Sequence, residues 1–434
     1  SDHNMEQSLE NKLIKADKAF KEWKKVPFEV KQNYIAKAAE LFKTKSQEFG
    51  AIITKEMNKP ISQSIAEVEK CALMMNYYTE AENVLQPEKI PSEYKISEIH
   101  YVPKGVILGV MPWNFPFWQV LRFATPTILA GNTVVLKHAS ICFESGNAIE
   151  KIFLEAGFPE GVFQNLEIGH KEVKEVLEHQ TIKGVSLTGS EKAGAEVASI
   201  AGKNIKKSLL ELGGSDAFIV LDDAHLDEAA KVGALARLQN CGQTCVAAKR
   251  FIIQKNIEKD FLPKFIGEYK KYIPADPMNK ETKLGGMARP DLADDLEKQY
   301  QKALDHGAEI IIPLERISDT EFIPGLIGVK EGNPILQEEL FGPLGMVMIV
   351  ENDAEALEMA NNIPFGLSNS VWTKDTERQQ FFIDGLESGT VNINRMTSSD
   401  PRFPFGGTKS SGYGTELSLF ALKEFVTAKT VLGK

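Results

Sequence analysis

Short apolar segments alternate with helix-length amphipathic segments from Gly105 almost to the end of the chain, and this alternation constrains the fold more than any other feature. Glycine or polar turn residues bound each apolar segment. The segments are GVILGV (105–110), TVVLK (133–137), GVSLTG (184–189), AFIVL (217–221), RFIIQ (250–254), EIIIP (309–313), MVMIV (346–350), SVWT (370–373) and GTVNIN (389–394). Strands that alternate with helices are typical of parallel sheets. The two series of segments therefore predict an α/β fold with two parallel-sheet domains.

The N-terminal part of the chain has a helical pattern instead. Leu13, Ala16 and Trp23 recur on the apolar face of an amphipathic helix, and further helical patterns follow the prolines at 27 and 60. Two other pieces, 85–103 and 427–432, are extended and predict strands that pair with each other or with another subunit.

Composition excludes several classes of protein. The 434 residues include 60 acidic and 50 basic side chains, so the net charge is −10 and an acidic surface argues against nucleic acid as a partner. Apolar runs fall short of the roughly 18 residues that span a bilayer, which predicts no membrane association and a soluble, cytoplasmic enzyme. The four cysteines are too few and too irregularly spaced for a disulfide framework or a zinc site, so no metal is expected.

One cysteine lies in a setting that suits a nucleophile. Cys245 ends the segment NCGQTC, a glycine-containing turn that leads into a strand. A thiol with a pKa near 8.5 is mostly protonated at neutral pH and needs a base. The histidines form no motif with an acid, so the better base is Glu211, a carboxylate among leucines in LELGG. The alternatives are a small buried cysteine and a carboxylate at the surface or at a helix end.

Asn114 lies in the segment PWNFP, directly after the first apolar segment. Two flanking prolines make this corner rigid, and the ends of strands are where α/β folds bind ligands. An amide there can donate to a developing oxyanion, a contact worth on the order of 3 kcal/mol in the transition state. The alternative is an asparagine that caps a turn.

The stretch 184–194 predicts a strand, a turn at Thr188, Gly189 and Ser190, and a helix. A glycine turn before a helix presents free N–H groups to a pyrophosphate, although two glycines are a looser pattern than the three-glycine dinucleotide fingerprint.

Two further segments carry polar groups at places where a predicted strand or helix ends. Lys137 and Ser140 follow a strand and are placed to face a ribose, whereas Glu339 and Phe341 adjoin a Gly-Pro break. The alternatives are a solvated lysine, an exposed acidic turn and a core phenylalanine.

Together these segments resemble the aldehyde dehydrogenase superfamily along nearly the whole chain. The motifs, in family order, are PWNFP (112–116), TGS (188–190), ELGG (211–214), GQTC (242–245), EELFGP (338–343) and PFGG (404–407). The resemblance implies that Cys245 attacks the aldehyde carbon, that Asn114 and the Cys245 amide bind the oxyanion, and that Glu211 activates the hydrolytic water.

The resemblance also implies a nicotinamide cofactor, NAD or NADP. Its contacts would be Trp113, Lys137, Ser140, Thr188, Gly189, Ser190, Gly213, Glu339 and Phe341. At position 140, members that prefer NAD usually carry a glutamate, which would repel a 2′-phosphate. A serine there removes that repulsion and makes NADP use possible.

The expected organisation follows from the same resemblance: two Rossmann-like domains and a small bridging sheet. Residues 1–84 and 104–213 would bind the dinucleotide and 214–426 would be catalytic. Residues 85–103 and 427–434 would form an oligomerisation sheet in a homodimer or homotetramer.

Arg122 and the tail segment SDPR before PFGG resemble bacterial succinate-semialdehyde dehydrogenases within that superfamily. Arg122 lies eight residues after Asn114, about 12 Å along a helix, where it would clamp a distal carboxylate, and Phe405 would line the aldehyde site. The alternative for Arg122 is a surface salt bridge.

The predicted function is therefore NAD(P)-dependent oxidation of an aldehyde, with succinate semialdehyde favoured, through a cysteine thiohemiacetal and a thioester. A broad-specificity aldehyde dehydrogenase is the nearest rival. An acylating enzyme that transfers the acyl group to coenzyme A or phosphate would not need Glu211, and an inactive scaffold protein would not need the intact Cys245.

Overall fold

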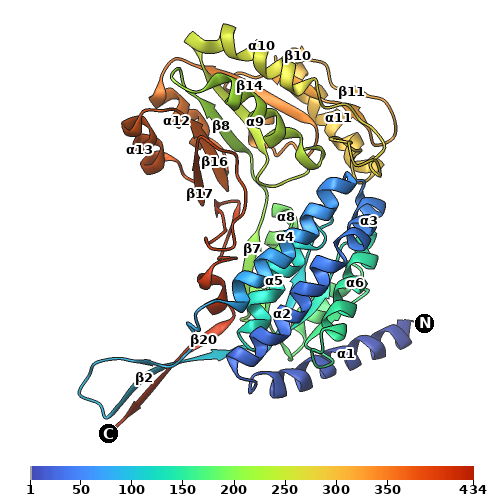
Figure 1. Ribbon diagram of the computed structural model, residues 1–434, viewed down its shortest axis with the longest axis vertical. Coiled ribbons are helices and arrows are strands. Elements are labelled where there is room, and N and C mark those ends of the chain that lie inside the picture. Colours follow the sequence, from blue (N-terminus) through green and yellow to red (C-terminus); the bar gives the residue numbers. More distant parts are fainter. Residues whose placement is uncertain (1) are drawn as a thin grey trace.

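Two large sheets organise the chain in this computed structural model, which describes residues 2–434 (Figure 1). The first sheet has six strands in the order β19-β7-β6-β3-β4-β5. In chain order they are β3 (Val106–Val110), β4 (Thr133–Lys137), β5 (Phe163–Asn165), β6 (Ile182–Thr188), β7 (Lys207–Glu211) and β19 (Gly412–Tyr413). All neighbours are parallel except the edge strand β19, which is antiparallel to β7.

The second sheet has seven strands in the order β10-β13-β14-β9-β8-β16-β17. They are β8 (Asp216–Val220), β9 (Ala248–Gln254), β10 (Glu309–Ile312), β13 (Gly325–Gly328), β14 (Leu344–Val350), β16 (Ser368–Trp372) and β17 (Thr390–Ile393). Only the edge strand β10 is antiparallel among the pairs of this sheet that the structure describes. The α/β prediction is confirmed, with antiparallel strands added at one edge of each sheet.

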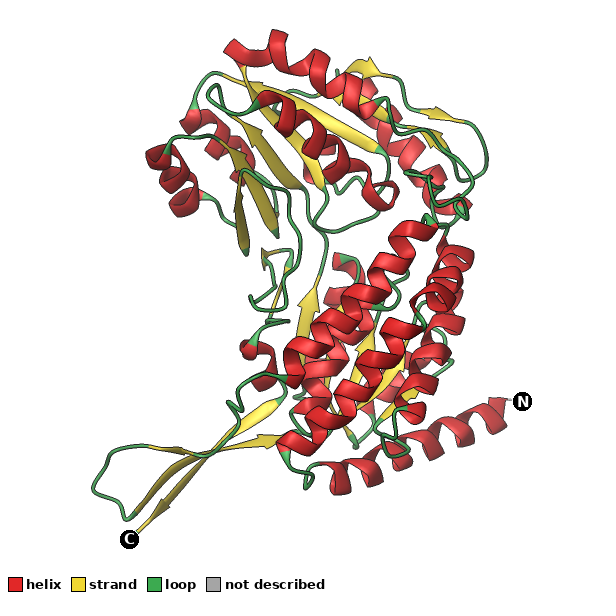
Figure 2. Cartoon of the chain, in the orientation of Figure 1, coloured by secondary structure: helices red, strands yellow, loops and turns green. Residues whose placement is uncertain are grey.

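Helices cover both faces of each sheet, which explains why the central strands are continuous apolar runs rather than alternating ones (Figure 2). One face of the first sheet packs on α2–α6 and the other on α1, α7 and α8. These helices are α1 (Asp2–Trp23), α2 (Phe28–Thr44), α3 (Ser46–Met57), α4 (Ile61–Thr79), α5 (Trp118–Leu129), α6 (Phe143–Glu155), α7 (Glu172–Glu178) and α8 (Glu191–Lys203).

The second sheet is covered in the same manner, by α9 and α10 on one face and by α11, α12 and α13 on the other. Their bounds are α9 (Leu226–Leu238), α10 (Glu258–Tyr269), α11 (Pro290–Asp305), α12 (Asp353–Asn361) and α13 (Thr376–Gly385). None of the helices within residues 2–434 is both long and apolar enough to cross a membrane.

The two extended pieces of the chain pair with each other. Strand β2 (Ile96–Pro103) is antiparallel to β20 (Val426–Gly433) over its whole length, and the short β1 (Glu88–Lys89) joins the outer side of β2. This three-stranded sheet projects from the first large sheet as an arm (Figure 1).

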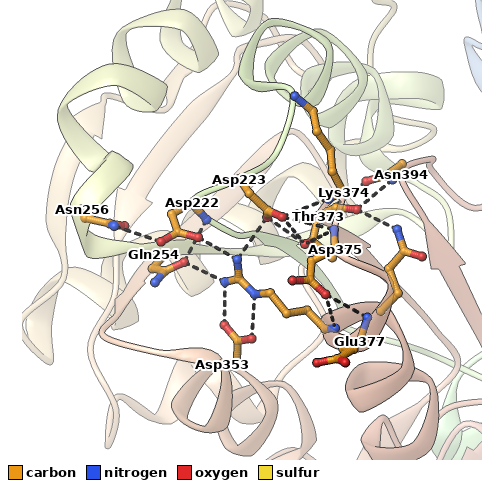
Figure 3. Close-up of polar contacts among 12 residues, drawn as sticks. Asp222, Asp223, Gln254, Asn256, Asp353, Thr373, Lys374, Asp375, Glu377 and Asn394 are labelled. Carbon is orange, nitrogen blue, oxygen red and sulfur yellow. Dashed lines mark hydrogen bonds and ion pairs between the residues drawn. The ribbon is translucent and has the colours of Figure 1, made fainter.

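A single guanidinium contacts residues at the carboxyl ends of three strands in the second sheet, and one of these residues connects it to a fourth strand (Figure 3). Arg378, on α13, donates from Nε and Nη2 to Asp353 at 2.8 and 2.7 Å, after β14. Its Nη1 donates to Asp222 at 2.7 Å, after β8, and its Nη2 to Gln254 at 3.2 Å, at the end of β9. Asp223, beside Asp222, also accepts from Nη1 and from Thr373 Oγ1, after β16.

Candidate active site

The predicted catalytic residues meet where the carboxyl edge of the first sheet faces the amino edge of the second. Asn114 follows β3, Glu211 is the last residue of β7, and Cys245 precedes β9. All three line one cavity of about 250 Å³. A second cavity of about 430 Å³, hereafter the larger cavity, is lined by Arg122 and Phe405 and also reaches Cys245. The cysteine is therefore the point at which the two cavities meet.

The turn before Cys245 has an unusual backbone. Asn240, Cys241 and Gly242 have φ angles of 54°, 57° and 74°, three successive residues in the left-handed region. At Gly242 the conformation is combined with a close approach, because a Cβ would overlap the carbonyl oxygen of Gly342. Only glycine fits there without strain. The GQTC and EELFGP motifs are thus in direct backbone contact.

Hydrogen bonds join this turn to the Asn114 corner. The Asn240 amide donates to the carbonyl oxygens of Asn114 at 3.0 Å and Gln243 at 3.1 Å. The Asn114 amide donates to the same Gln243 oxygen at 3.2 Å, and Arg237 donates to the Gly242 carbonyl at 2.6 Å. A primary amide carries two N–H donors, so Asn114 retains one for another acceptor.

Cys245 differs from the other cysteines in exposure. Cys71, Cys142 and Cys241 are buried, whereas Cys245 is partly exposed. Desolvation raises its pKa to about 11, against the opposing influence of Arg122 and Lys249. A thiol with this pKa is almost entirely protonated at neutral pH and needs a proton acceptor before it can attack.

Glu211 is a buried carboxylate of the kind that general bases require. It is 2% exposed, and neither of its oxygens has a hydrogen-bond partner among the residues that the structure describes. Desolvation raises its pKa well above the ordinary range, the nearby Glu416 adds to this, and Arg122 opposes it. The predicted alternatives, a surface or helix-end carboxylate, are wrong because Glu211 ends an interior strand.

Arg122 lies inside the protein. Its Nη2 is 3.2 Å from Glu416 Oε1, and both side chains are 3% exposed. The same nitrogen donates to Thr188 Oγ1 at 3.2 Å, and the guanidinium lies 4.7 Å from the centre of the Phe405 ring. A surface salt bridge is therefore wrong, yet the charge of Arg122 is already compensated by Glu416.

Most of the predicted dinucleotide contacts line the smaller cavity. They are Trp113, Thr188, Gly189, Ser190, Gly213, Glu339 and Phe341. Lys137 and Ser140 do not belong to that lining; Lys137 is buried at the end of β4, and Ser140 is exposed just beyond it. The assignment of Lys137 and Ser140 to the dinucleotide site remains a prediction.

The lining residues suit a nicotinamide dinucleotide. Ser190 caps α8, its Oγ accepting from the Ala193 N–H at 3.2 Å, and the first N–H groups of a helix are available to a phosphate. A Cβ on Gly213 would lie 2.8 Å from Glu339 Oε1, so glycine allows the Glu339 carboxylate to lie against the backbone there. Glu339 is itself held by the Gly214 N–H at 2.8 Å.

Two functional neighbours of the site were missed from the sequence. Lys249 is completely buried and donates to the carbonyl oxygens of Thr244 and Cys245, both at 2.8 Å. Two consecutive cations in an apolar strand, Lys249 and Arg250, were a signal for buried charges with a specific task. Glu416 had no such signal, since only the folded chain brings it to Arg122.

His138 has a defined role beside the Asn114 corner. Its Nδ1 accepts from the Ala139 N–H at 2.8 Å, so its Nε2 carries the hydrogen and donates to the Pro116 carbonyl at 2.8 Å. Burial lowers the pKa of His138 to about 4. The neutral ring therefore supports the PWNFP turn at neutral pH.

Comparisons with known proteins agree on one family. The model of the aldehyde dehydrogenase family matches residues 3–431. A probable succinate-semialdehyde dehydrogenase [NADP(+)] of Synechocystis sp. is 45% identical over 97% of this chain and 93% of its own length. The succinate-semialdehyde dehydrogenase [NADP(+)] of Deinococcus radiodurans is 39% identical over 96% of this chain and 89% of its own.

Solved structures give the same result. The crystal structure of succinic semialdehyde dehydrogenase from Streptococcus pyogenes, in complex with NADP+ as the cofactor, has a TM-score of 0.95 and 36% identity. The match covers 98% of this chain and 94% of that one.

Proposed function

Because the chain belongs to the aldehyde dehydrogenase family, we propose that it oxidises succinate semialdehyde to succinate with NAD(P). The observation that carries this proposal is the meeting of two cavities at Cys245, one suited to a dinucleotide and the other able to hold an aldehyde. The names of the relatives support the choice of aldehyde.

The first step forms a carbon–sulfur bond. Glu211, as carboxylate, accepts the proton of the Cys245 thiol, and the sulfur attacks the aldehyde carbon. The carbonyl π electrons move to oxygen, and the free N–H of Asn114 and the backbone N–H of Cys245 donate to this oxyanion. The product is a thiohemiacetal on Cys245.

The second step oxidises that carbon. The carbon loses a hydride, and with it two electrons, which a nicotinamide dinucleotide held in the smaller cavity would accept. Cys245 then carries a thioester. The residues that would hold the cofactor are those of the Thr188–Ser190 turn together with Gly213 and Glu339.

The third step restores the thiol. After the thiol proton has passed from Glu211 to solvent, Glu211 removes a proton from a water molecule, which attacks the thioester carbon. The carbon–sulfur bond breaks to give the carboxylic acid, and the leaving Cys245 sulfur takes the proton from Glu211 to become the thiol again. A buried carboxylate suits this task because its raised pKa makes it a stronger base.

For the cofactor we propose that NADP is accepted as well as NAD. A serine at position 140 brings no negative charge against a 2′-phosphate, and the names of the Synechocystis and Deinococcus relatives specify NADP(+). For assembly we propose a homodimer or homotetramer in which the exposed arm, β2 and β20, contacts a neighbouring chain. Light scattering on the intact protein tests the assembly.

One observation favours a rival. The pairing of Arg122 with Glu416 leaves little charge for a second carboxylate, as expected for an enzyme of neutral aldehydes. A steady-state panel of succinate semialdehyde and butanal, each with NAD and NADP, decides between the two. We expect kcat/KM to favour succinate semialdehyde by at least about tenfold, and no reduced cofactor from Cys245→Ala; equal values for both aldehydes would contradict the proposed substrate.

A further inference from the structure

Three cations line the larger cavity: Lys59, just before α4, Lys70 on α4 and Arg122 on α5. Lys59 is paired with Glu67, both side chains being almost completely buried. Arg122 is paired with Glu416. Each of these two cations therefore already has a counter-ion in the structure.

Lys70 is different. Its ammonium lies over the ring of Trp118, 4.6 Å from the ring centre, and Trp118 lines the same cavity. Among the residues that the structure describes, no carboxylate lies within ion-pair distance of it, and no hydrogen-bond acceptor is recorded for it. Asp400, a loop carboxylate that influences the pKa of Lys70, is held by Arg402 at 2.7 Å.

We propose that Lys70 binds the carboxylate at the far end of the substrate and thereby selects an ω-carboxylated aldehyde over a neutral one. A cation that is partly removed from water and has no counter-ion gains most from an entering anion. The aromatic ring beneath the ammonium limits its positions while leaving its N–H donors free. The inference rests on the proposed function, since it names how the same site would recognise succinate semialdehyde.

The charged groups around Lys70 agree with this role. The pKa of Lys70 is lowered to about 8, chiefly by burial and also by the charge of Arg122 on α5. Cys71 and Glu67 on α4 and Asp400 in the loop oppose these effects. An anion that arrives beside Lys70 would favour its charged form.

The test compares Lys70→Met and Lys70→Arg with the wild type. Lys37→Met is the matched control, because the Lys37 ammonium also lies over an aromatic ring, 5.8 Å from the centre of Tyr34, but outside the larger cavity. We expect Lys70→Met to raise KM for succinate semialdehyde at least about tenfold, with a change of no more than about threefold for butanal. Lys70→Arg should restore most of the preference, and Lys37→Met should leave both substrates unchanged.

The pH dependence adds a second readout. In the wild type, kcat/KM for succinate semialdehyde should fall relative to butanal as the pH rises through about 8, because Lys70 loses its charge. In Lys70→Arg this relative fall should disappear, since arginine stays charged. A purely structural lysine would not produce this difference.

The outcomes separate the two proposals. If the wild type prefers succinate semialdehyde and Lys70→Met keeps that preference, the role of Lys70 is overturned while the proposed function stands. If the wild type shows no preference, the proposed substrate itself is wrong. A loss of both activities in Lys70→Met with Lys70→Arg equally inactive would assign Lys70 a structural role and overturn the inference.

Discussion

The Lys249 ammonium lies 3.2 Å from the Glu339 carboxylate and, in the same position, donates to the backbone carbonyls of Thr244 and Cys245. One buried side chain thus joins the turn that carries the nucleophile to a wall of the smaller cavity. A substitution at Lys249 is therefore expected to affect both the turn that carries Cys245 and the cavity wall at Glu339.

Lys249→Met tests this connection. Loss of the ammonium would leave Glu339 without its cation and two carbonyls without a donor, a change that typically costs about 3–5 kcal/mol at a buried pair. We expect a lower kcat and weaker dinucleotide binding together, measured by steady-state kinetics and by fluorescence titration. Lys255→Met, at an exposed pair with Glu351, is the control and should behave as wild type.

Glu211→Gln tests both proton transfers assigned to this residue, from the Cys245 thiol and from the hydrolytic water. The amide keeps the size of the side chain but accepts no proton, so water attack on the thioester should be slowed at least about a hundredfold. With excess substrate we expect at most one equivalent of reduced cofactor per site, followed by a stall, in rapid-quench or stopped-flow experiments. A linear time course at the wild-type rate would exclude Glu211 as the hydrolytic base.

The acid side of the pH profile reports on the same carboxylate. Burial and Glu416 raise the pKa of Glu211 well above the ordinary glutamate value of about 4.3. As the pH falls, Glu211 therefore loses its basic form at a higher pH than an ordinary glutamate does. Glu416→Gln removes a neighbouring carboxylate and leaves Arg122 uncompensated. Both changes lower the pKa of Glu211, and the acid limb of kcat/KM should move to lower pH; a shift in the opposite direction would contradict the assignment.

Gly242→Ala should damage stability and activity together. The residue has a φ of 74°, and its Cβ would overlap the Gly342 carbonyl, so backbone must move. We expect a loss of about 2–4 kcal/mol in urea unfolding. Gly202→Ala is the matched control: its Cβ would meet nothing within 4 Å in helix α8, and it should gain about 0.5–1 kcal/mol.

Arg378→Gln tests the cluster that joins the strand ends of the second sheet. Arg378 is about one-fifth exposed and is paired with three aspartates. Because solvent screens these ion pairs in part, we expect the substitution to lower the free energy of unfolding by about 2 kcal/mol. Kinetic constants should change little, because no atom of the cluster lines either cavity at Cys245. A large effect on kcat with normal stability would contradict this purely structural role.

Local patterns predicted most strands of the two large sheets, but β5, β7, β13 and β19 were missed. Strands such as β3 and β8 are buried on both faces, so their sequences are uniform apolar runs. The strand β7 was missed because it begins with Lys207 and Ser208, and only its last three residues are buried. Its final residue is Glu211, so the strand that positions the base had a weak local signal.

The charge balance of the site depends on contacts that no local pattern contains. Arg122 and Glu416 are nearly three hundred residues apart, and their pairing requires the C-terminal segment to return to the first sheet at β19. The sequence predicted a clamp from Arg122 because it gave no sign of that partner. Lys70 was overlooked because it lies on a helix that had no catalytic character of its own.

The Arg378 cluster also limits how many nucleotides one chain can hold. The carboxyl edge of a parallel sheet is the usual seat for a dinucleotide, and this protein has two such edges. In the second sheet the Arg378 guanidinium occupies that edge. It makes two hydrogen bonds to Asp353 and one to Asp222. Calorimetric titration should accordingly give a stoichiometry of one dinucleotide per polypeptide, despite the repeated architecture.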